Sequence, residues 1–299
     1  MSWLGIETGG TKIVGRLVSK EGVMVAERRW ATTTPPAAVS DLIAFVDDAV
    51  PPEDPLIAVG IAAFGPLLID PHHPDCGRML GTAKPGWTDS NLRADLAGVL
   101  GVPVTVDTDV NAAALSERAN GAGRGCASVA YVTIGTGIGA GLASATGALR
   151  GALHPEIGHL RLVRRSGDDA TSTCPFHDDC AEGLAAGPAV ARRLRPGETL
   201  FDRSDVRDLV ADYLAQLLAA IVLAWSPHRI VVGGGVGAAP GMLAAIRAAY
   251  SGAFGGYGVG PTAQSADFIL AAMLEHAGLE GAVLLARGAF HSSPMKEVA

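Results

Sequence analysis

One pattern occurs twice in the chain and constrains its fold more than any other feature: an apolar strand, a glycine-rich turn and a second apolar strand. The first copy runs from WLGI (3–6) through the TGGTK turn to IVGRLVS. The second copy, SVAYVTIGTGIGAGLAS, begins near residue 127. Apolar runs bounded by glycine indicate strands. The repeat therefore predicts two similar lobes on either side of a cleft.

Strands and helices alternate through the remainder of the chain. LIAVGIAAFG (56–65) is typical of a buried strand, and VPVTVDTD (102–109) predicts another strand that ends on aspartates. Such alternation predicts an α/β fold. We expect the boundary near residue 110, with an N-terminal lobe over 1–110 and a C-terminal lobe over 111–299.

Composition and charge exclude several classes of protein. The 299 residues are 48% hydrophobic, which is enough for a substantial core. The net charge is −7 and no basic block occurs, so we expect no nucleic-acid partner. Residues 1–10 do not resemble a signal peptide, and the apolar run 214–225 is too short to span a bilayer and predicts a buried helix. We therefore expect a cytoplasmic protein without a membrane partner, whose four cysteines are free or metal-bound.

Three glycine-rich turns indicate binding of phosphate groups. They are ETGGTK (7–12), GTGIGAG (135–141) and GGGVG (233–237). Glycine allows the backbone to approach a phosphate closely, and exposed N–H groups in such turns form anion-binding nests. None has P-loop spacing, and the third also fits a plain structural turn or half of a dinucleotide-binding motif. Two of the turns open the two lobes, which favours a nucleotide site.

The order of these turns resembles the two-lobed actin-like (hexokinase/ribonuclease H-like) ATPase fold, whose active site lies in the cleft between the lobes. By this resemblance Glu7 occupies the place of an aspartate that holds Mg²⁺ in many relatives. The resemblance implies ATP-phosphate contacts from Gly9, Gly10, Thr11, Lys12, Gly135, Thr136 and Gly137, and an adenosine pocket lined by Gly233, Gly234 and Gly235.

Asp109 is the candidate catalytic base. It ends one expected strand and opens the next helix in DTDVNAAALSE (107–117). Aspartate is a common helix cap, so capping alone is one interpretation. In a phosphoryl transferase, a carboxylate beside the sugar hydroxyl accepts its proton late in a loose transition state. Both roles are compatible with this position.

Two cysteines and two histidines have the spacing of a metal site. Cys174, His177 and Cys180 lie in TCPFHDDCAEG, and His159 ends the upstream segment HPEIGH. Two thiolates and two imidazoles suit tetrahedral Zn²⁺, and a site with four protein ligands has no open position for hydrolysis. We therefore predict a structural zinc; the alternative is a polar loop in which these residues occur by coincidence.

This pattern also makes the resemblance more specific. The run Glu156-Ile-Gly-His159, followed by the cysteine-containing loop and Glu182, resembles the ROK family of repressors, open-reading-frame proteins and kinases, from residue 3 to about 290. The usual ROK loop has three cysteines, whereas here a histidine replaces one thiolate. This variation, with ETGGTK, AAFGPLLID, KPGW, DTDVN and HPEIGH, most resembles the bacterial ROK fructokinases.

The resemblance implies roles in sugar binding. Glu156, His159 and Glu182 would contact the sugar hydroxyls together with Asp109, and the zinc would preorganise this site through His159 and the neighbour of Glu182. Thr108 stands where common relatives carry asparagine. Gly65 and Pro66 would shape the sugar-side wall through their backbone. Lys84 and Trp87 are either fructose-side contacts or surface residues.

We consider three functions. The first is an enzyme that uses ATP and Mg²⁺ to phosphorylate a hexose by direct in-line transfer, with D-fructose expected before mannose, glucose or another hexose. The second is a ROK repressor, but only six residues precede Glu7, so we expect no helix-turn-helix domain. The third is a non-catalytic sugar sensor, against which the phosphate turns and Asp109 argue. Family resemblance implies a homodimer.

Overall fold

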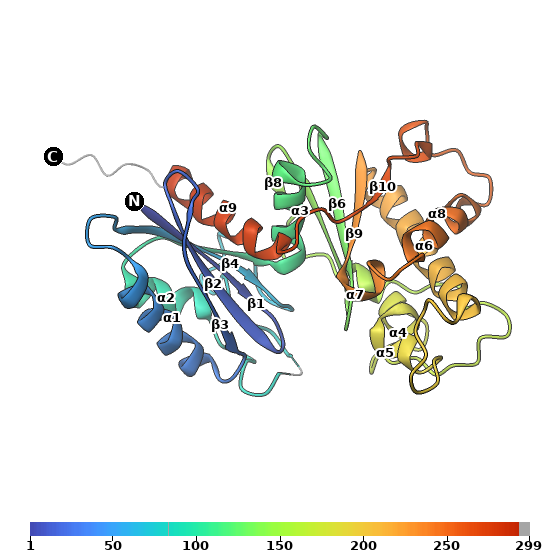
Figure 1. Ribbon diagram of the computed structural model, residues 1–299, viewed down its shortest axis with the longest axis horizontal. Coiled ribbons are helices and arrows are strands. Elements are labelled where there is room, and N and C mark those ends of the chain that lie inside the picture. Colours follow the sequence, from blue (N-terminus) through green and yellow to red (C-terminus); the bar gives the residue numbers. More distant parts are fainter. Residues whose placement is uncertain (83, 293–299) are drawn as a thin grey trace. The chain divides into compact units, whose positions relative to one another are not determined.

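The computed structural model describes residues 1–82 and 84–292 of the chain, which forms two compact units (Figure 1). The first unit contains Met1–Ser116, Ala148–His154 and the chain from His276 onward. The second contains Glu117–Gly147 and Pro155–Glu275. Each unit has its own hydrophobic core and its own five-stranded sheet.

In the first unit the strand order is β3-β2-β1-β4-β5. β1, β2 and β3 form an antiparallel meander, and β4 and β5 run parallel to β1. The elements are β1 (Ser2–Thr8), β2 (Lys12–Ser19), β3 (Met24–Ala31), α1 (Pro35–Ala49), β4 (Leu56–Ala63), α2 (Leu92–Leu100), β5 (Val104–Thr108), α3 (Asp109–Asn120) and α9 (Ala277–Ser292).

The last helix, α9, belongs to the first unit and packs on β1 and β4, although the expected boundary put it in the C-terminal lobe. Glycine in the strands makes this approach possible. A Cβ on Gly60 would overlap the carbonyl oxygen of Ala282, and a Cβ on Gly5 would lie 2.6 Å from Val283 Cγ2. The helix backbone therefore lies directly against the sheet, a contact between the two ends of the chain that local sequence does not reveal.

The division between the units falls within α3, a few residues after the expected position near 110. Ser116 Oγ donates a hydrogen bond to the carbonyl oxygen of Ala277 in the first unit. The next residue, Glu117, is fully buried and accepts hydrogen bonds from the N–H groups of Met273 and Leu274 in the second unit. Adjacent residues of one helix are thus bound to different units.

The second unit repeats the meander with strand order β10-β9-β6-β7-β8. β6 pairs antiparallel with β7 and parallel with β9, which pairs parallel with β10. The elements are β6 (Ser128–Ile134), β7 (Ile138–Ser144), β8 (Gly147–Ala148), the 3₁₀ turn η1 (Ile157–His159), α4 (Ala181–Ala185), α5 (Gly187–Ala191), α6 (Ser204–Trp225), β9 (Arg229–Gly233), α7 (Gly234–Gly237), α8 (Met242–Tyr250), the 3₁₀ turns η2 (Ser251–Phe254) and η3 (Thr262–Gln264), and β10 (Ile269–Ala271).

Helix α6 is long and apolar enough to cross a membrane by length and composition alone. Its residues include Val210, Leu214, Leu217 and Ile221, which are buried in the core of the second unit. The prediction that 214–225 forms a buried helix is confirmed as far as Val222, because this face packs against α4 and α8, whereas Leu223 is exposed.

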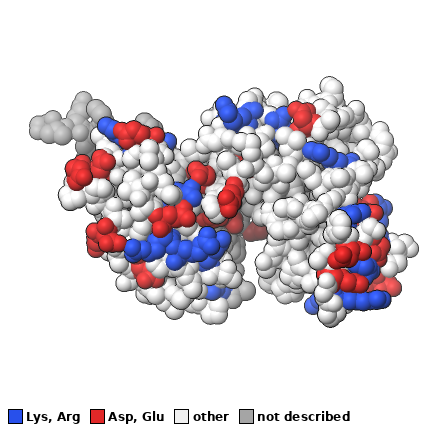
Figure 2. Space-filling model, in the orientation of Figure 1, with Lys and Arg blue, Asp and Glu red and all other residues white. Residues whose placement is uncertain are grey.

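Basic and acidic side chains are interspersed on the face of the molecule shown in Figure 2. Several are paired, including Arg28 with Asp48 (2.7 Å) and Arg203 with Glu198 (2.9 Å). A row of basic side chains crosses the first unit on this face, with acidic side chains beside it.

Candidate functional site

The first glycine turn connects β1 to β2 and is closed by a hydrogen bond from Gly9 N–H to the carbonyl oxygen of Lys12 (2.8 Å). Thr32 binds the turn from the end of β3. Its hydroxyl donates to the Gly9 carbonyl (2.6 Å) and its N–H to the Thr11 carbonyl (3.0 Å). Since C=O and the following N–H point in opposite directions in a trans peptide, the N–H groups of Gly10 and Lys12 face away from Thr32.

Lys84 binds the one remaining carbonyl of this turn. Its ammonium donates to the Gly10 carbonyl (2.8 Å). The segment that carries Lys84 is anchored by Trp87, whose ring is 1% exposed, contacts Phe64 and donates Nε1–H to the Thr33 carbonyl (2.7 Å). The interpretation of Trp87 as a surface residue is therefore wrong: it anchors the loop that delivers Lys84 to the turn.

Glu7 lies on β1, immediately before this turn. A Cβ on Gly278 would lie 2.5 Å from Glu7 Oε1, so the first turn of α9 leaves space for the carboxylate only because it carries glycine. Burial raises the pKa of Glu7, and the positive charges of Lys12 and His276 oppose that rise. A further positive charge such as Mg²⁺ would favour the ionised form in the same way.

Asp109 is the first residue of α3, as predicted, but it is not the cap. The N–H of Asn111 donates to the hydroxyl of Thr108 (3.1 Å), so Thr108 provides the capping hydrogen bond. Asp109 Oδ1 accepts from the adjacent Val110 N–H (2.8 Å). Since Thr108 already caps the helix, capping alone does not explain an aspartate at this position.

A buried ion pair behind Asp109 was not predicted. Asp107 is fully buried and accepts from Arg150 Nε (2.8 Å), from Asn111 Nδ2 (2.7 Å) and from the Thr108 N–H (2.8 Å). The pair holds the end of β5, and with it the start of α3, in a defined position. A buried aspartate in a strand was the available sequence signal, but its partner lies 43 residues away in sequence.

Gly65 and Pro66, joined by a cis peptide bond, follow β4. The Pro66 carbonyl accepts from Leu80 N–H (2.8 Å). The next N–H, of Leu67, donates to Nε2 of His154 (3.2 Å). His154 is buried and comes from the HPEIGH segment, so it supports the predicted sugar-side wall although it was not predicted to do so.

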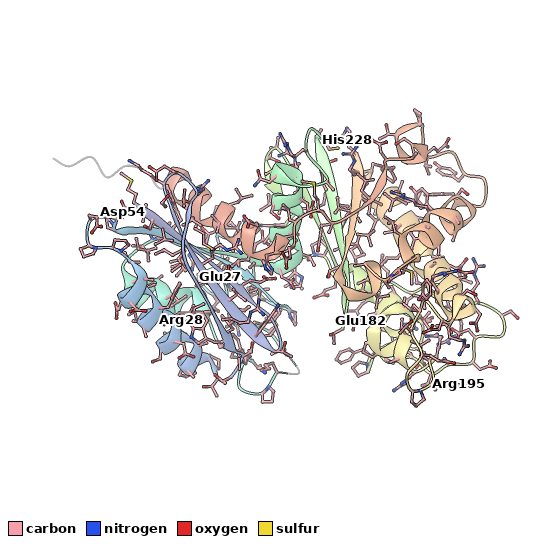
Figure 3. All side chains as sticks on the ribbon, in the orientation of Figure 1. Glu27, Arg28, Asp54, Glu182, Arg195 and His228 are labelled. Atoms are coloured by element: carbon pink, nitrogen blue, oxygen red, sulfur yellow. The ribbon has the colours of Figure 1, made fainter. Side chains whose placement is uncertain are left out.

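The second glycine turn connects β6 to β7. Gly135 N–H donates to the Gly137 carbonyl (2.9 Å), and Gly187 N–H, at the start of α5, donates to the Gly135 carbonyl (2.7 Å). Glu182 (labelled in Figure 3) accepts from Ile138 N–H at Oε2 (3.1 Å). A Cβ on Gly137 would lie 2.6 Å from that same oxygen. A carboxylate predicted to bind sugar thus also holds the predicted phosphate turn.

Thr136, at the centre of this turn, is exposed. The first glycine turn likewise exposes Gly10 and Thr11. Each turn therefore presents its central residue to solvent, as contact with a phosphate requires.

The four residues predicted to bind metal come together in the second unit. One ligand atom from each of His159, Cys174, His177 and Cys180 lies within 4.8 Å of the others. Cys174 Sγ is 3.7 Å from His159 Nδ1 and 3.6 Å from His177 Nδ1. Two sulfur and two nitrogen donors at this spacing fit a tetrahedral zinc site.

The cluster is connected to the second glycine turn through backbone. Gly158 lies so close to β7 that a Cβ would overlap the carbonyl oxygen of Ile138. Cys180 caps α4 by accepting from Gly183 N–H (3.3 Å), and the same helix carries Glu182. Burial raises the pKa of Cys180 to about 11, so binding of a cation there requires loss of a proton.

Glu156 precedes η1, and His159 ends it. Glu156 is exposed, whereas His159 is half-buried within the cluster. Glu156, His159 and Glu182, which are predicted to contact sugar, therefore all belong to the second unit. Asp109, the fourth predicted contact, belongs to the first.

The third glycine turn joins β9 to α7, and its glycines have different roles. A Cβ on Gly233 would overlap the Tyr131 hydroxyl, and a Cβ on Gly234, which has φ +81°, would lie 2.5 Å from the Ile134 carbonyl oxygen. Packing therefore requires glycine at both positions. No atom lies within 4 Å of a Cβ built on Gly235, so packing does not require glycine there and leaves the position open to a ligand.

The family model described as ROK family matches residues 3–289. This chain belongs to the ROK family. The ROK chain is 37% identical over 290 residues to a fructokinase of Pediococcus pentosaceus, covering 96% of this chain and 98% of that protein. Its fold matches the ROK hexokinase of Thermus thermophilus (TM-score 0.81, 29% identity, 98% and 100% of the two chains).

A second solved structure is also similar to this ROK chain. It is a glucokinase of Streptomyces griseus in complex with glucose and AMPPNP, with a TM-score of 0.75, 28% identity and coverage of 96% and 100% of the two chains. The α/β prediction and the actin-like ATPase fold shared by ROK sugar kinases are thereby confirmed.

Proposed function

We propose that this ROK protein transfers the γ-phosphoryl group of ATP to D-fructose, forming fructose 6-phosphate. The class of enzyme, an ATP-dependent sugar kinase, follows from its family and its most similar relatives. The proposed chemistry rests on Asp109, a carboxylate at the start of α3. Thr108 provides the capping hydrogen bond of this helix, so capping does not account for Asp109. The choice of fructose rests on the similarity to the Pediococcus fructokinase.

The glycine turns would hold the phosphates of ATP. The N–H groups of Gly10, Thr11 and Lys12 in the first unit face away from the donors on Thr32 and Lys84. N–H groups fixed in advance stabilise phosphoryl charge without reorganising during transfer. The turn at 135–137 would act in the same way in the second unit, and Gly235 would lie beside the adenosine.

Asp109 would contact the reacting hydroxyl of the sugar. The hydroxyl oxygen forms a bond to the γ-phosphorus as the bond from that phosphorus to the bridging oxygen of ADP breaks. The hydroxyl proton passes to the Asp109 carboxylate, and ADP leaves with the electron pair of the broken bond. Because the transition state is loose, the carboxylate needs little basicity.

Mg²⁺, when bound, neutralises charge on the transferring phosphoryl group. Glu7 is the residue of the first unit that would hold it. The carboxylate fits this role because Gly278 leaves space beside it and because a cation would oppose the rise in its pKa that burial causes.

The cluster of His159, Cys174, His177 and Cys180 would hold a structural zinc. Zinc, when bound, fixes η1 and the start of α4, which carry the proposed sugar contacts Glu156, His159 and Glu182. Metal analysis of untagged protein purified without chelator should find about one zinc per chain. Protein that contains no metal yet remains fully active would contradict this assignment.

ADP release with D-fructose, D-mannose, D-glucose and N-acetylmannosamine, compared by kcat/KM, tests the substrate. Highest kcat/KM with fructose is expected. Preference for another hexose would overturn fructose but retain the kinase. No turnover with any sugar would contradict the proposed activity.

Asp109→Asn tests the base. The variant should fold normally and lose nearly all turnover, because amide oxygen does not accept the proton at neutral pH. Asp95→Asn, an exposed position in the first turn of α2, is the matched control and should retain activity. A tenth of the original rate in Asp109→Asn would overturn the assignment.

We also propose a cytoplasmic homodimer. Light scattering during gel filtration should give twice the chain mass of 30.4 kDa. A monomer that remains fully active would contradict the dimer.

A further inference from the structure

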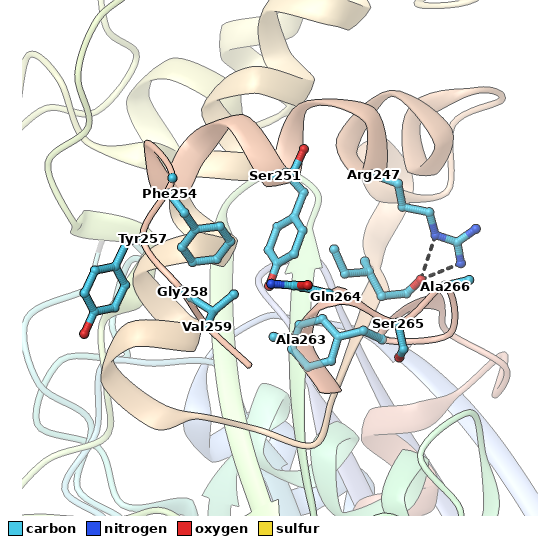
Figure 4. A pocket seen from close by; sticks show the side chains of 14 residues that line it. Arg247, Ser251, Phe254, Tyr257, Gly258, Val259, Ala263, Gln264, Ser265 and Ala266 are labelled. Atoms are coloured by element: carbon cyan, nitrogen blue, oxygen red, sulfur yellow. Dashed lines mark hydrogen bonds between the residues drawn. The ribbon is translucent and has the colours of Figure 1, made fainter. Parts of the chain in front are cut away.

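The second unit contains a cavity of about 510 Å³ at the C-terminal end of α8 (Figure 4). Its volume lies within the usual range for small-molecule sites. None of its residues belongs to a glycine turn or to the cysteine–histidine cluster. It is lined by Arg247, Tyr250, Ser251, Phe254, Gly256, Tyr257, Gly258, Val259, Ala263, Gln264, Ser265, Ala266, Phe268 and Ile269.

Aromatic rings form much of its wall. The ring of Tyr250 packs edge-on against Phe254, with centroids 5.0 Å apart, and lies 6.0 Å from Phe268. Tyr257 adds a further ring that is 70% exposed, and Val259 adds aliphatic surface. Flat rings in a cavity favour a flat apolar ligand, against which they stack.

One polar atom in this wall has no described partner. The side chain of Tyr250 is 8% exposed, and its hydroxyl makes no hydrogen bond to any residue that the structure describes. A buried hydroxyl without a partner is costly, so native proteins rarely leave one. Burial also raises the pKa of Tyr250 to about 12, so the hydroxyl keeps its proton within the wall and is not itself exposed to the cavity.

The charge at the cavity is positive. Arg247 is the only ionised lining residue, and its Nε–H donates to the Ile269 carbonyl (2.9 Å). No salt bridge between Arg247 and a carboxylate occurs among the described residues. The nearby Asp267 is already paired with Arg229 (2.7 Å). A negative group on a ligand would thus meet a cation that lacks a counterion.

We propose that this cavity binds a small molecule with a flat apolar body and one anionic group, the body lying among the rings of Tyr250, Phe254 and Phe268 and the anion facing Arg247. The site is separate from the residues proposed for ATP and sugar, so the proposal does not depend on the kinase assignment.

The dye 8-anilinonaphthalene-1-sulfonate is a suitable probe, because it combines flat rings with one sulfonate. Fluorescence titration of the whole protein with saturating ATP and Mg²⁺, which occupy the proposed nucleotide site, should show one saturable site per chain. The uncharged analogue N-phenyl-1-naphthylamine should bind about fivefold more weakly, because an exposed ion pair contributes little. Absence of saturable binding would overturn the proposal.

Ser251→Trp tests the location. This exposed residue lines the cavity, so an indole there should block entry and weaken dye binding at least tenfold without unfolding the protein. Ser166→Trp, an exposed position outside the cavity, should bind the dye normally. Arg247→Gln should remove the preference for the anionic dye over its neutral analogue. Unchanged binding in Ser251→Trp, with an unchanged thermal midpoint, would overturn the location.

Discussion

The two glycine turns that open the two sheets have the same sequence character but are held by different means. In the first turn all three carbonyls, of Gly9, Gly10 and Thr11, accept from Thr32 or from the ammonium of Lys84. In the second, backbone N–H of Gly187 binds the Gly135 carbonyl. A carboxylate, on Glu182, binds the adjoining strand N–H.

This difference teaches that one type of turn can be preorganised in two ways. Two of the three donors to the first turn are the side chains of Thr32 and Lys84, which a substitution can remove singly, and the third is the Thr32 N–H. The second turn depends on main-chain contacts and on a helix whose start is part of the cysteine–histidine cluster. Its geometry should therefore respond to metal, whereas that of the first should not.

Gly158→Ala should have the largest effect and test the dependence of the second turn on backbone contact. The new methyl group would overlap the Ile138 carbonyl, which cannot move without displacing β7. We expect a loss of about 3 kcal/mol in the free energy of unfolding and reduced zinc content. Urea denaturation and metal analysis measure both. Gly252→Ala, where a Cβ has open space, is the control, and equal stability of the two variants would contradict the packing argument.

Glu182→Ala should raise the KM for ATP about tenfold, because a hydrogen bond to a charged acceptor at the second turn is lost. Glu182→Gln keeps an oxygen acceptor and should have a smaller effect. Steady-state kinetics with each substrate varied in turn separates the two proposed roles of this side chain. If only the KM for sugar changes, Glu182 acts on the sugar and not on the turn.

Lys84→Met should raise the KM for ATP about fivefold by releasing the Gly10 carbonyl, an exposed contact. Lys84→Arg can still donate to that carbonyl and should restore most of the affinity. Zinc content should not change in either variant. A change in the KM for fructose with no change for ATP would instead support the role of Lys84 as a sugar contact.

Glu7→Gln should change the thermal stability of the metal-free protein slightly, which is the smallest of these effects on the protein itself. Burial raises the pKa of Glu7 in the folded protein. Near pH 7 the ionised carboxylate is therefore less stable in the folded protein than in the unfolded chain. The variant should unfold at a slightly higher temperature at pH 7. This advantage should shrink as the pH falls and the carboxyl takes up its proton. Thermal unfolding from pH 7 to pH 4 measures it, and an advantage that grows on acidification would contradict the burial argument.

Much of the cysteine–histidine cluster was predictable because three of its members lie within seven residues, from Cys174 to Cys180. Loop geometry alone brings such residues near one another. The long-range contacts of Trp87 and Asp107 were not predictable in the same way. Trp87 is 54 positions from Thr33 and Asp107 is 43 positions from Arg150, and the sequence around each residue does not indicate its partner.

The sequence by itself determined the repeated strand–glycine–strand units, the α/β alternation, the position of Asp109 at the start of a helix and the composition of the cluster. These follow from apolar periodicity and from spacing, which act over short distances along the chain. Only the tertiary structure decided that α9 packs in the first unit, that Thr108 rather than Asp109 caps α3, and that Glu182 holds the second glycine turn. The packing of α9 and the contact of Glu182 join residues far apart in sequence, which leave no periodic signal. The cap is local, but it depends on the backbone geometry at the start of α3.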